Sequence, residues 1–267
     1  MSSLPPLLLA NWKMNLCVSE SRSLARAIAK SVLNARKNKS TRANVQVVLV
    51  PSFTALDAVA RVGSRSGAFS IGAQDCFWEE RGAYTGEESV CSLREIGVSF
   101  VLIGHSERRQ YVNESNEAIR KKIECVSNDS TMIPVLCIGE NHSQKVLGKR
   151  KSVLQQQLLS ALKGLFQRRL TREIVIAYEP VWAIGTGVPA TAVDCAEVYR
   201  YIRGLMENAW GAAAVGRLCR IIYGGSVSES TVTDFVSKDI SDGALIGGAS
   251  LTASGFTRIV HGVMDSL

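Results

Sequence analysis

The sequence predicts an α/β fold in which eight parallel strands and their connecting helices close into a single (βα)8 barrel spanning residues 1–267. Short apolar runs of strand length recur eight times at fairly even spacing, and each is followed by a segment with helical apolar periodicity. No break in composition marks a linker, and αβ barrels of about this length usually form one domain. Six such strands could form an open doubly wound sheet, whereas eight favour closure.

The predicted strands are apolar runs, each ending in a polar or glycine-containing turn. In chain order they are Leu7–Ala10, Val45–Val50, Phe69–Ala73, Phe100–Ile103, Met132–Cys137, Ile174–Ala177, Leu218–Tyr223 and Ala244–Ile246. Continuous apolar runs of this kind are typical of strands buried on both faces.

The segments between the strands carry apolar residues on one helical face. After the first strand this face comprises Leu24, Ala27, Ile28, Ser31, Val32 and Ala35. After the fifth strand it comprises Val153, Leu154, Leu158, Leu162 and Leu165. Because parallel strands need a crossover connection, this alternation of strand and helix indicates a parallel sheet.

Composition and charge exclude some classes of function. Hydrophobic residues make up 46% of the chain and charged residues 21%, which indicates a folded protein rather than a disordered one. The net charge of +7 mildly favours small anions as ligands. The basic runs Gly148–Lys151 and Gln167–Arg172 flank a helical pattern and are expected to be solvated helix ends. No aromatic residues interleave with them to stack on bases, so we expect no nucleic-acid partner.

The cysteines and the apolar segments bear on location. The seven cysteines show no CxxC or other metal-ligand spacing and are expected to be free, mostly buried thiols in a reducing compartment. No apolar stretch approaches the ~18 residues of a membrane span, and Leu4–Ala10 is too short for a signal peptide. The C-terminal Asp265-Ser266-Leu267 differs from the peroxisomal Ser-Lys-Leu signal. We therefore expect a cytoplasmic protein with no membrane partner.

The stretch after the sixth predicted strand has the features of a lid. Pro180 biases the preceding Glu179 toward an extended backbone, so the carboxylate is directed. Val181 and Trp182 then form an apolar tip beside the flexible Gly185 and Gly187, which suits a segment that closes over a ligand. The alternative is an ordinary strand-to-helix loop that happens to contain a tryptophan.

Polar residues follow the predicted strands at the end where barrels place their active sites. Asn11 and Lys13 follow the first strand, two apart, so an extended backbone would point both the same way. His105 and Glu107 follow the fourth strand, and Glu179 follows the sixth. Each residue alone could be a solvated or structural group. Their common position at one rim favours a functional site.

Glycine-containing turns follow the last two predicted strands, where barrels bind phosphate. The expected donors to phosphate are Gly185, Ser226, Gly247 and Gly248. No Walker motif is present, so the phosphate should be bound rather than transferred. Gly185–Ala190 has the spacing of a dinucleotide fingerprint but lies past the strand end and contains Pro189, so no nicotinamide cofactor is expected.

The rim therefore offers one carboxylate, one imidazole and one ammonium group beside a phosphate site. The other histidines, His142 and His261, lie far from this rim in the sequence, so we expect no metal site. A base with charge-stabilising donors suits proton abstraction next to a carbonyl. Glu179 would take the proton, and Lys13 and His105 would stabilise the developing oxyanions.

The chain resembles the triosephosphate isomerase family from end to end. The resemblance is carried by Asn11–Asn15, Gly104–Arg109, Leu136–Glu140, Ala177–Gly187, Tyr223–Val227 and Gly243–Leu251, in the family's order. It implies cofactor-free interconversion of dihydroxyacetone phosphate and D-glyceraldehyde 3-phosphate in glycolysis and gluconeogenesis, under a lid at residues 180–190.

The resemblance also implies roles for single residues. Asn11 and Lys13 would bind substrate, and Glu179 would be the base. His105 would be the electrophile, a neutral imidazole as is characteristic of this family. Glu107 would act in catalysis by supporting Lys13.

The family forms homodimers through the loop after the third strand, here Gln74–Glu88. Met14, Thr85 and Gly86 are the expected interface residues. The loop also contains aromatic residues that would form an exposed apolar patch, namely Phe77, Trp78 and Tyr84.

The chain departs from the family pattern at three places. Asp75 stands where asparagine is usual, which adds a charge near the expected interface, and Ser228 also replaces a usual asparagine. Val188-Pro189 replaces a lysine-containing lid hinge, and the proline should stiffen it.

Two other functions remain open at this point. A Schiff-base aldolase on the same barrel would use Lys13 as nucleophile, although neighbouring carboxylates oppose the lowered lysine pKa that it needs. A non-catalytic sugar-phosphate binding protein would be expected to lack the base or the electrophile, and Glu179, His105 and Lys13 are all present.

Overall fold

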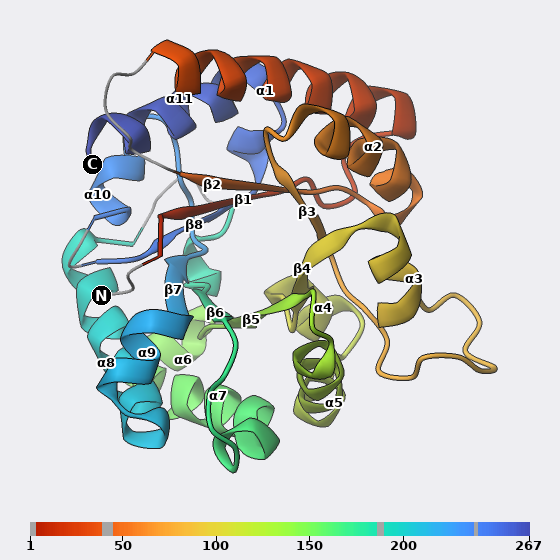
Figure 1. The fold of residues 1–267 in the computed structure, drawn as a ribbon. Coiled ribbons are helices and arrows are strands. Elements are labelled where there is room, and N and C mark those ends of the chain that lie inside the picture. Colours follow the sequence, from red (N-terminus) through yellow and green to blue (C-terminus); the bar gives the residue numbers. More distant parts are fainter. Residues whose placement is uncertain (1–3, 39–44, 186–189, 238–239) are drawn as a thin grey trace.

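The strands of the protein form one closed parallel barrel (Figure 1). The computed structural model describes residues 4–38, 45–185, 190–237 and 240–267. In chain order the strands are β1 (Leu7–Asn11), β2 (Gln46–Val50), β3 (Ser70–Ala73), β4 (Val98–Ile103), β5 (Ile133–Ile138), β6 (Ile174–Tyr178), β7 (Cys219–Tyr223) and β8 (Gly243–Ile246). The predicted barrel is confirmed, and all eight apolar runs are strands whose ends differ from the predicted ones by at most two residues.

The barrel closes between its first and last strands. Leu7 of β1 pairs with Gln46 of β2 on one side and with Gly243 of β8 on the other. A Cβ atom at position 243 would lie 2.0 Å from the carbonyl oxygen of Leu7, so only glycine permits this close approach. Alternate strand residues fill the interior, including Leu9, Val50 and Phe100, while the other face of each strand packs against helices.

Helices surround the barrel (Figure 1). They are α1 (Val18–Asn38), α2 (Leu56–Ser66), α3 (Val90–Ile96), α4 (Ser106–Tyr111), α5 (Asn116–Asn128), α6 (His142–Val146), α7 (Arg150–Phe166), α8 (Ala192–Trp210), α9 (Ala212–Leu218), α10 (Val232–Phe235) and α11 (Ala253–Asp265). Short 3-10 turns are η1 (Phe53–Ala55), η2 (Val181–Ala183) and η3 (Gly248–Ser250). None of the helices within the described part of the chain is both long and apolar enough to cross a membrane.

Most of the predicted apolar helix faces are buried. In α7, Leu154, Leu158 and Leu162 are buried as expected. In α1 the prediction was wrong at Ala27, which is exposed, whereas Ala25 and Ala29 are buried. The buried residues Ala25, Ile28, Ala29, Val32 and Ala35 form one stripe that does not include position 27, on a helix that packs against α2 and α11.

Side-chain caps fix where several helices begin. Ser89, Ser115, Thr191 and Thr252 each accept a hydrogen bond from a backbone N–H in the first turn of α3, α5, α8 and α11, respectively. Asn141 and Gln144 form a reciprocal capping box at the start of α6.

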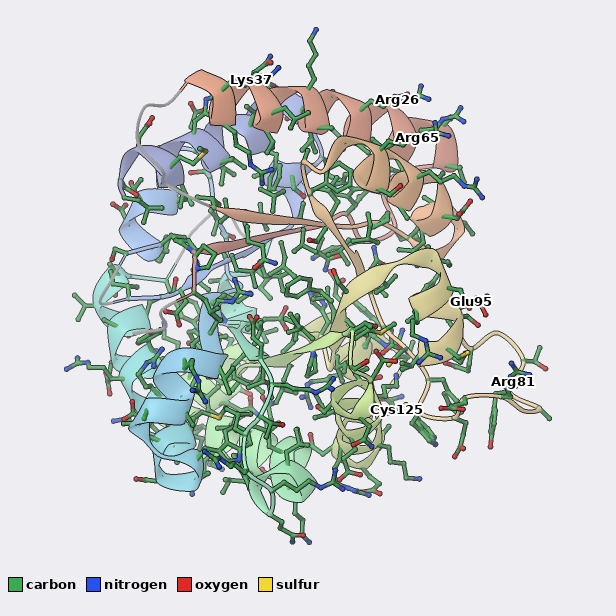
Figure 2. The ribbon with its side chains drawn as sticks, viewed as in Figure 1. Arg26, Lys37, Arg65, Arg81, Glu95 and Cys125 are labelled. Atoms are coloured by element: carbon green, nitrogen blue, oxygen red, sulfur yellow. The ribbon has the colours of Figure 1, made fainter. Side chains whose placement is uncertain are left out.

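The cysteines are all free, as expected, and four of the seven are buried, namely Cys76, Cys137, Cys195 and Cys219. The loop between β3 and α3 projects from the barrel, and Figure 2 shows Arg81 at its outer part.

Candidate active site

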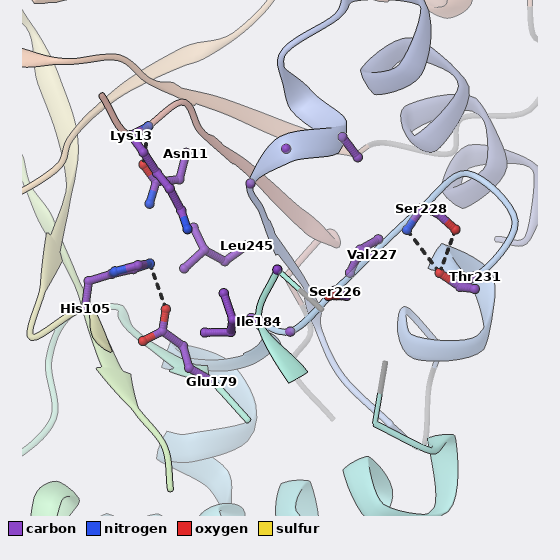
Figure 3. A pocket seen from close by; sticks show the side chains of 16 residues that line it. Asn11, Lys13, His105, Glu179, Ile184, Ser226, Val227, Ser228, Thr231 and Leu245 are labelled. Atoms are coloured by element: carbon purple, nitrogen blue, oxygen red, sulfur yellow. Dashed lines mark hydrogen bonds and ion pairs between the residues drawn. The ribbon is translucent and has the colours of Figure 1, made fainter. Parts of the chain in front are cut away.

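The carboxyl ends of the strands surround a cavity of about 310 Å³ (Figure 3). Eight of the residues expected at the site line it, namely Asn11, Lys13, His105, Glu179, Gly185, Ser226, Gly247 and Gly248. The remaining lining residues are Ile184, Gly224, Gly225, Val227, Ser228, Thr231, Leu245 and Ala249. The expected acid, base, electrostatic and phosphate-binding groups thus share one cavity.

Lys13 is held by contacts to its backbone. β1 ends at Asn11, whose Oδ1 accepts a hydrogen bond from the N–H of Lys13 (3.0 Å). Lys13 itself has φ +52°, in the left-handed region, so the extended backbone expected from residue spacing is wrong here. Gln74 Nε2 donates to the carbonyl oxygen of Lys13 (2.8 Å), which helps to hold this unfavourable conformation.

The ammonium group of Lys13 is positioned by Glu107. Lys13 Nζ lies 2.6 Å from Glu107 Oε1 in a half-buried ion pair. Glu107 is not among the residues that line the cavity. Its carboxylate therefore contacts Lys13 from the side of α4, as expected for a supporting residue.

His105 caps the helix that carries Glu107. It is the N-cap of α4, and its Nδ1 accepts a hydrogen bond from the N–H of Glu107 (3.2 Å). An accepting Nδ1 carries no proton, so the neutral ring has its proton on Nε2, which lies 2.9 Å from Glu179 Oε1. This tautomer agrees with the neutral imidazole that the family resemblance implies.

The charges around His105, in contrast, favour its protonated form. Burial lowers the pKa of His105, but the carboxylates of Glu179 and Glu107 raise it by more, so this pKa lies above its usual value. The largest raising influence comes from Glu179 in its present position. Movement of that carboxylate away from the ring would lower the pKa of His105 and favour the neutral form.

Glu179 is a buried and ionised carboxylate. It directly follows β6 and is only 1% exposed. Its Oε2 accepts a hydrogen bond from the backbone N–H of Ser106 (2.8 Å). Burial raises the pKa of Glu179, but His105, the N–H of Ser106 and Lys13 lower it by more, so the carboxyl group stays charged.

The first part of the expected lid is fastened to Glu140, a residue that sequence reasoning did not single out. Trp182 Nε1 donates to Glu140 Oε1 (2.8 Å), and the hydroxyl of Tyr178 donates to the same carboxylate (3.1 Å). Arg150 Nε lies 3.2 Å from Glu140 Oε1, which balances this fully buried charge. Residues 186–189, which include Gly187, Val188 and Pro189, lie outside the described part of the chain.

The expected phosphate-binding turns form another part of the cavity wall. Ser226 Oγ donates to the carbonyl oxygen of Ala183 (2.6 Å), which ties this turn to η2. Gly247 and Gly248 lead into η3, whose Ser250 Oγ donates to the carbonyl oxygen of Gly247 (2.7 Å). Backbone turns therefore form this side of the cavity, with Ser228 and Thr231 hydrogen-bonded to each other at its edge (Figure 3).

Asp75 lies in a buried cluster of compensating charges. Its carboxylate accepts hydrogen bonds from Lys122 Nζ (2.7 and 2.8 Å) and lies 2.8 Å from Arg108 Nη2. Glu114 contacts both of these cations, so two carboxylates face two cations inside one chain. Burial raises the pKa of Asp75 to about 6, and Glu114 acts in the same direction against the two cations.

The expected interface residues lie away from the cavity. Met14 is 95% exposed, and Thr85 and Gly86 are also exposed. The loop aromatics are less open than expected, because Phe77 stacks on Trp78 (4.0 Å between ring centroids) and packs on Tyr84 (4.6 Å). Among these rings only Tyr84 is substantially exposed, at 44%. Within the described residues no group of three or more His, Cys, Asp or Glu residues is arranged to hold a metal ion.

Comparison with known proteins gives one consistent family. A model of the triosephosphate isomerase family matches residues 6–263. The triosephosphate isomerase of Caldanaerobacter subterraneus subsp. tengcongensis is 43% identical over 257 residues, covering 96% of this chain and 98% of the relative. That of Moorella thermoacetica is 41% identical over 256 residues, covering 96% and 98% of the two chains.

A solved structure is similar over the whole chain. The crystal structure of triosephosphate isomerase from Bartonella henselae has a TM-score of 0.80 and 32% sequence identity, and the match covers 97% of this chain and 99% of that one. These findings set aside the aldolase and the non-catalytic binding protein. The chain belongs to the triosephosphate isomerase family and is an intramolecular isomerase that interconverts dihydroxyacetone phosphate and D-glyceraldehyde 3-phosphate.

Proposed function

We propose that Glu179 is the base that moves a proton between C1 and C2 of the triose phosphate, with Lys13 and His105 as electrophiles. The observation that carries this proposal is that an ionised Glu179 lies 2.9 Å from His105 in the cavity that Lys13 also lines. A buried carboxylate beside two hydrogen-bond donors suits enolisation of a carbonyl compound.

The proposed reaction is balanced within the substrate. Glu179 removes a proton from C1 of dihydroxyacetone phosphate, and the electrons of that C–H bond form the enediolate. Lys13 stabilises the negative charge on oxygen, and Nε2–H of His105 exchanges a proton between the two oxygens. Glu179 then returns its proton to C2, so neither a cofactor nor a net oxidation is required.

The charge network prepares Lys13 and Glu179 for these steps. Glu107 and Gln74 hold Lys13 by its ammonium group and its carbonyl group, respectively. Asn11 contacts the same backbone and would orient substrate beside Lys13. Glu179 must exchange its hydrogen bond from Ser106 for the substrate carbon before it can act as a base.

The phosphate of the substrate would be held by the backbone of Gly185, Ser226, Gly247 and Gly248. These residues line the same cavity as Asn11 and Lys13, and Gly247 lies beside the Lys13 side chain, where a Cβ atom would be 3.9 Å from Nζ. The lid at residues 180–190 would close over this phosphate and exclude water. Closure would also prevent the enediolate from eliminating phosphate.

We further propose that residues 1–267 act as one domain in a cytoplasmic homodimer. The loop Gln74–Glu88 would contact the partner through Thr85 and Gly86 near its Met14. The strong exposure of Met14 supports this, since such a side chain is stabilised when another chain covers it. The free thiols fit a reducing compartment, and glycolysis is the pathway that uses this reaction.

A coupled assay of both triose phosphates, run with sedimentation, tests these proposals. We expect turnover in both directions without added metal or cofactor, and a sedimentation coefficient of a dimer. Deuterium from the solvent should enter the carbon-bound position that Glu179 protonates. Borohydride trapping of a substrate adduct on Lys13 would instead show Schiff-base chemistry and contradict the proposed role of that residue.

A further inference from the structure

A second hollow lies at the other end of the barrel from the active site. It has a volume of about 270 Å³ and adjoins the start of β6 at Ile174, whereas Glu179 follows the opposite end of that strand. The basic run Gln167–Arg172, which the isomerase reaction does not use, forms part of its wall. The arginines of this run are exposed just after the end of α7, as expected, and they also line this hollow.

The base of the hollow is apolar. Met132 and Ile174 are buried there, and Leu165, Leu170 and Trp210 are half-buried beside them. Trp210 Nε1 already donates to the carbonyl oxygens of Arg168 (3.2 Å) and Leu165 (3.4 Å). The indole ring is thus fixed in place with its one donor occupied, and it presents an apolar surface.

Arginine residues surround this apolar base. Arg172 Nη1 donates to the carbonyl oxygen of Asp129 (2.5 Å), and Arg168 Nη1 donates to Asn128 Oδ1 (3.2 Å). Within the described part of the chain, no hydrogen bond or ion pair engages the side chain of Arg169. Both Arg168 and Arg169 are exposed, so their remaining N–H groups are accessible to a ligand.

The acidic residue that lines this hollow does not neutralise the arginines. Glu173 also lines the hollow, but its Oε1 accepts a hydrogen bond from Arg220 Nε (2.5 Å). Arg220 is completely buried at the start of β7, so it requires this carboxylate as its counter-ion. The hollow therefore keeps an excess of positive charge.

We infer that this hollow binds a small amphipathic anion, namely a carboxylate or phosphate ester attached to one ring or a short chain. The apolar base would hold the ring or chain, and the arginines would hold the acidic group. Its volume lies just below the ~300 Å³ at which pockets for drug-sized ligands begin, which limits the ligand to a small one. The site does not depend on the isomerase reaction.

The test uses the fluorescent anion 8-anilinonaphthalene-1-sulfonate as a probe on the full chain. Arg169→Gln should weaken its binding by about fivefold, the loss expected for one exposed charged hydrogen bond. The matched control is Arg65→Gln, which removes an exposed arginine from α2 on another face (Figure 2) and should leave binding unchanged. Equal binding by all three proteins would overturn the inference.

A neutral analogue of the probe distinguishes binding through its negative charge from binding through its apolar rings. N-phenyl-1-naphthylamine lacks the sulfonate and should bind several-fold more weakly than the anionic probe. Equal affinity for both probes would mean that the hollow binds only through its apolar surface. Inhibition of isomerisation by the anionic probe, competitive with substrate, would show that the probe binds in the active site. Either result contradicts the inference. Displacement of the probe by hexanoate or by phenyl phosphate then distinguishes a carboxylate ligand from a phosphate ester.

Discussion

The backbone N–H of Ser106 donates a 2.8 Å hydrogen bond to Oε2 of Glu179. This bond joins the first residue of α4 to the residue that follows β6, and it stabilises the charged form of a carboxylate that is almost completely buried. The proposed base is therefore ionised before substrate arrives. The N–H of Ser106 is a hydrogen-bond partner that Glu179 can leave when it moves to the reacting carbon.

Glu179→Asp should reduce kcat by about 10²-fold, because the shorter side chain withdraws the carboxylate by roughly 1 Å from the reacting carbon. Steady-state kinetics in both directions measures this. Glu229→Asp shortens an exposed carboxylate that pairs with Arg258 and should retain the wild-type rate. If Glu179→Asp keeps nearly full turnover, another group is the base.

His105→Ala should reduce kcat by roughly 10²–10³-fold, the cost of removing one oxyanion donor. His261→Ala is the matched control, because His261 is exposed on α11 and does not line the cavity. An unchanged rate in His105→Ala would mean that the electrophile lies elsewhere in the cavity. Circular dichroism of both variants separates this outcome from unfolding.

Gly139→Ala should destabilise the protein and lower turnover together. A Cβ atom at this position would lie 1.6 Å from the carbonyl oxygen of Glu179, so the backbone that carries the proposed base must shift. Gly204→Ala is the control, because its Cβ would meet no atom within 4 Å and lies inside α8. That change should stabilise the helix by up to about 1 kcal/mol. Thermal unfolding and steady-state kinetics of the two variants measure these effects. A normal rate in Gly139→Ala would show that Glu179 does not depend on the close approach of residue 139 to its carbonyl oxygen.

Asp75→Asn should become more stabilising as pH rises. Burial raises the pKa of Asp75 from 3.8 to about 6 in the folded protein. A carboxyl group with a raised folded pKa contributes stability below its unfolded pKa and loses it as pH rises through the folded pKa, here a total of about 3 kcal/mol. Asparagine does not titrate, so the variant should gain up to that amount over the wild type between about pH 4 and about pH 7.

Urea unfolding of the wild type and Asp75→Asn across this pH range measures the difference. Asp57→Asn, in the exposed pair with Arg61 on α2, reports the effect of losing one surface carboxylate. A difference between Asp75→Asn and wild type that stays constant with pH would contradict the raised pKa.

The strands and the rim residues could be predicted because their signals are local. A short apolar run such as Ile174–Ala177 predicts a buried strand. The residues directly after each parallel strand lie at one end of the barrel. The exposure of Ala27 in α1 could not be predicted, because packing against α2 and α11 decides which stripe of the helix is buried.

The contacts that support the site had no local signal. Ser106 acts through its backbone N–H, which every residue except proline possesses, so its identity reveals nothing. Glu140 and the cluster around Asp75 join side chains that are distant in the sequence and meet only after folding. The left-handed backbone of Lys13 is likewise imposed by tertiary contacts, because lysine itself does not favour it.

The position of Gln74 links two parts of the molecule with different tasks. Its amide holds the carbonyl group of Lys13, and the chain leaves the barrel immediately afterwards as the projecting loop that ends at Glu88. Movement of the loop can therefore reach the active-site lysine through Gln74. If the proposed homodimer forms through this loop, separating its subunits would also release Lys13, and the isolated chain would be folded but poorly active.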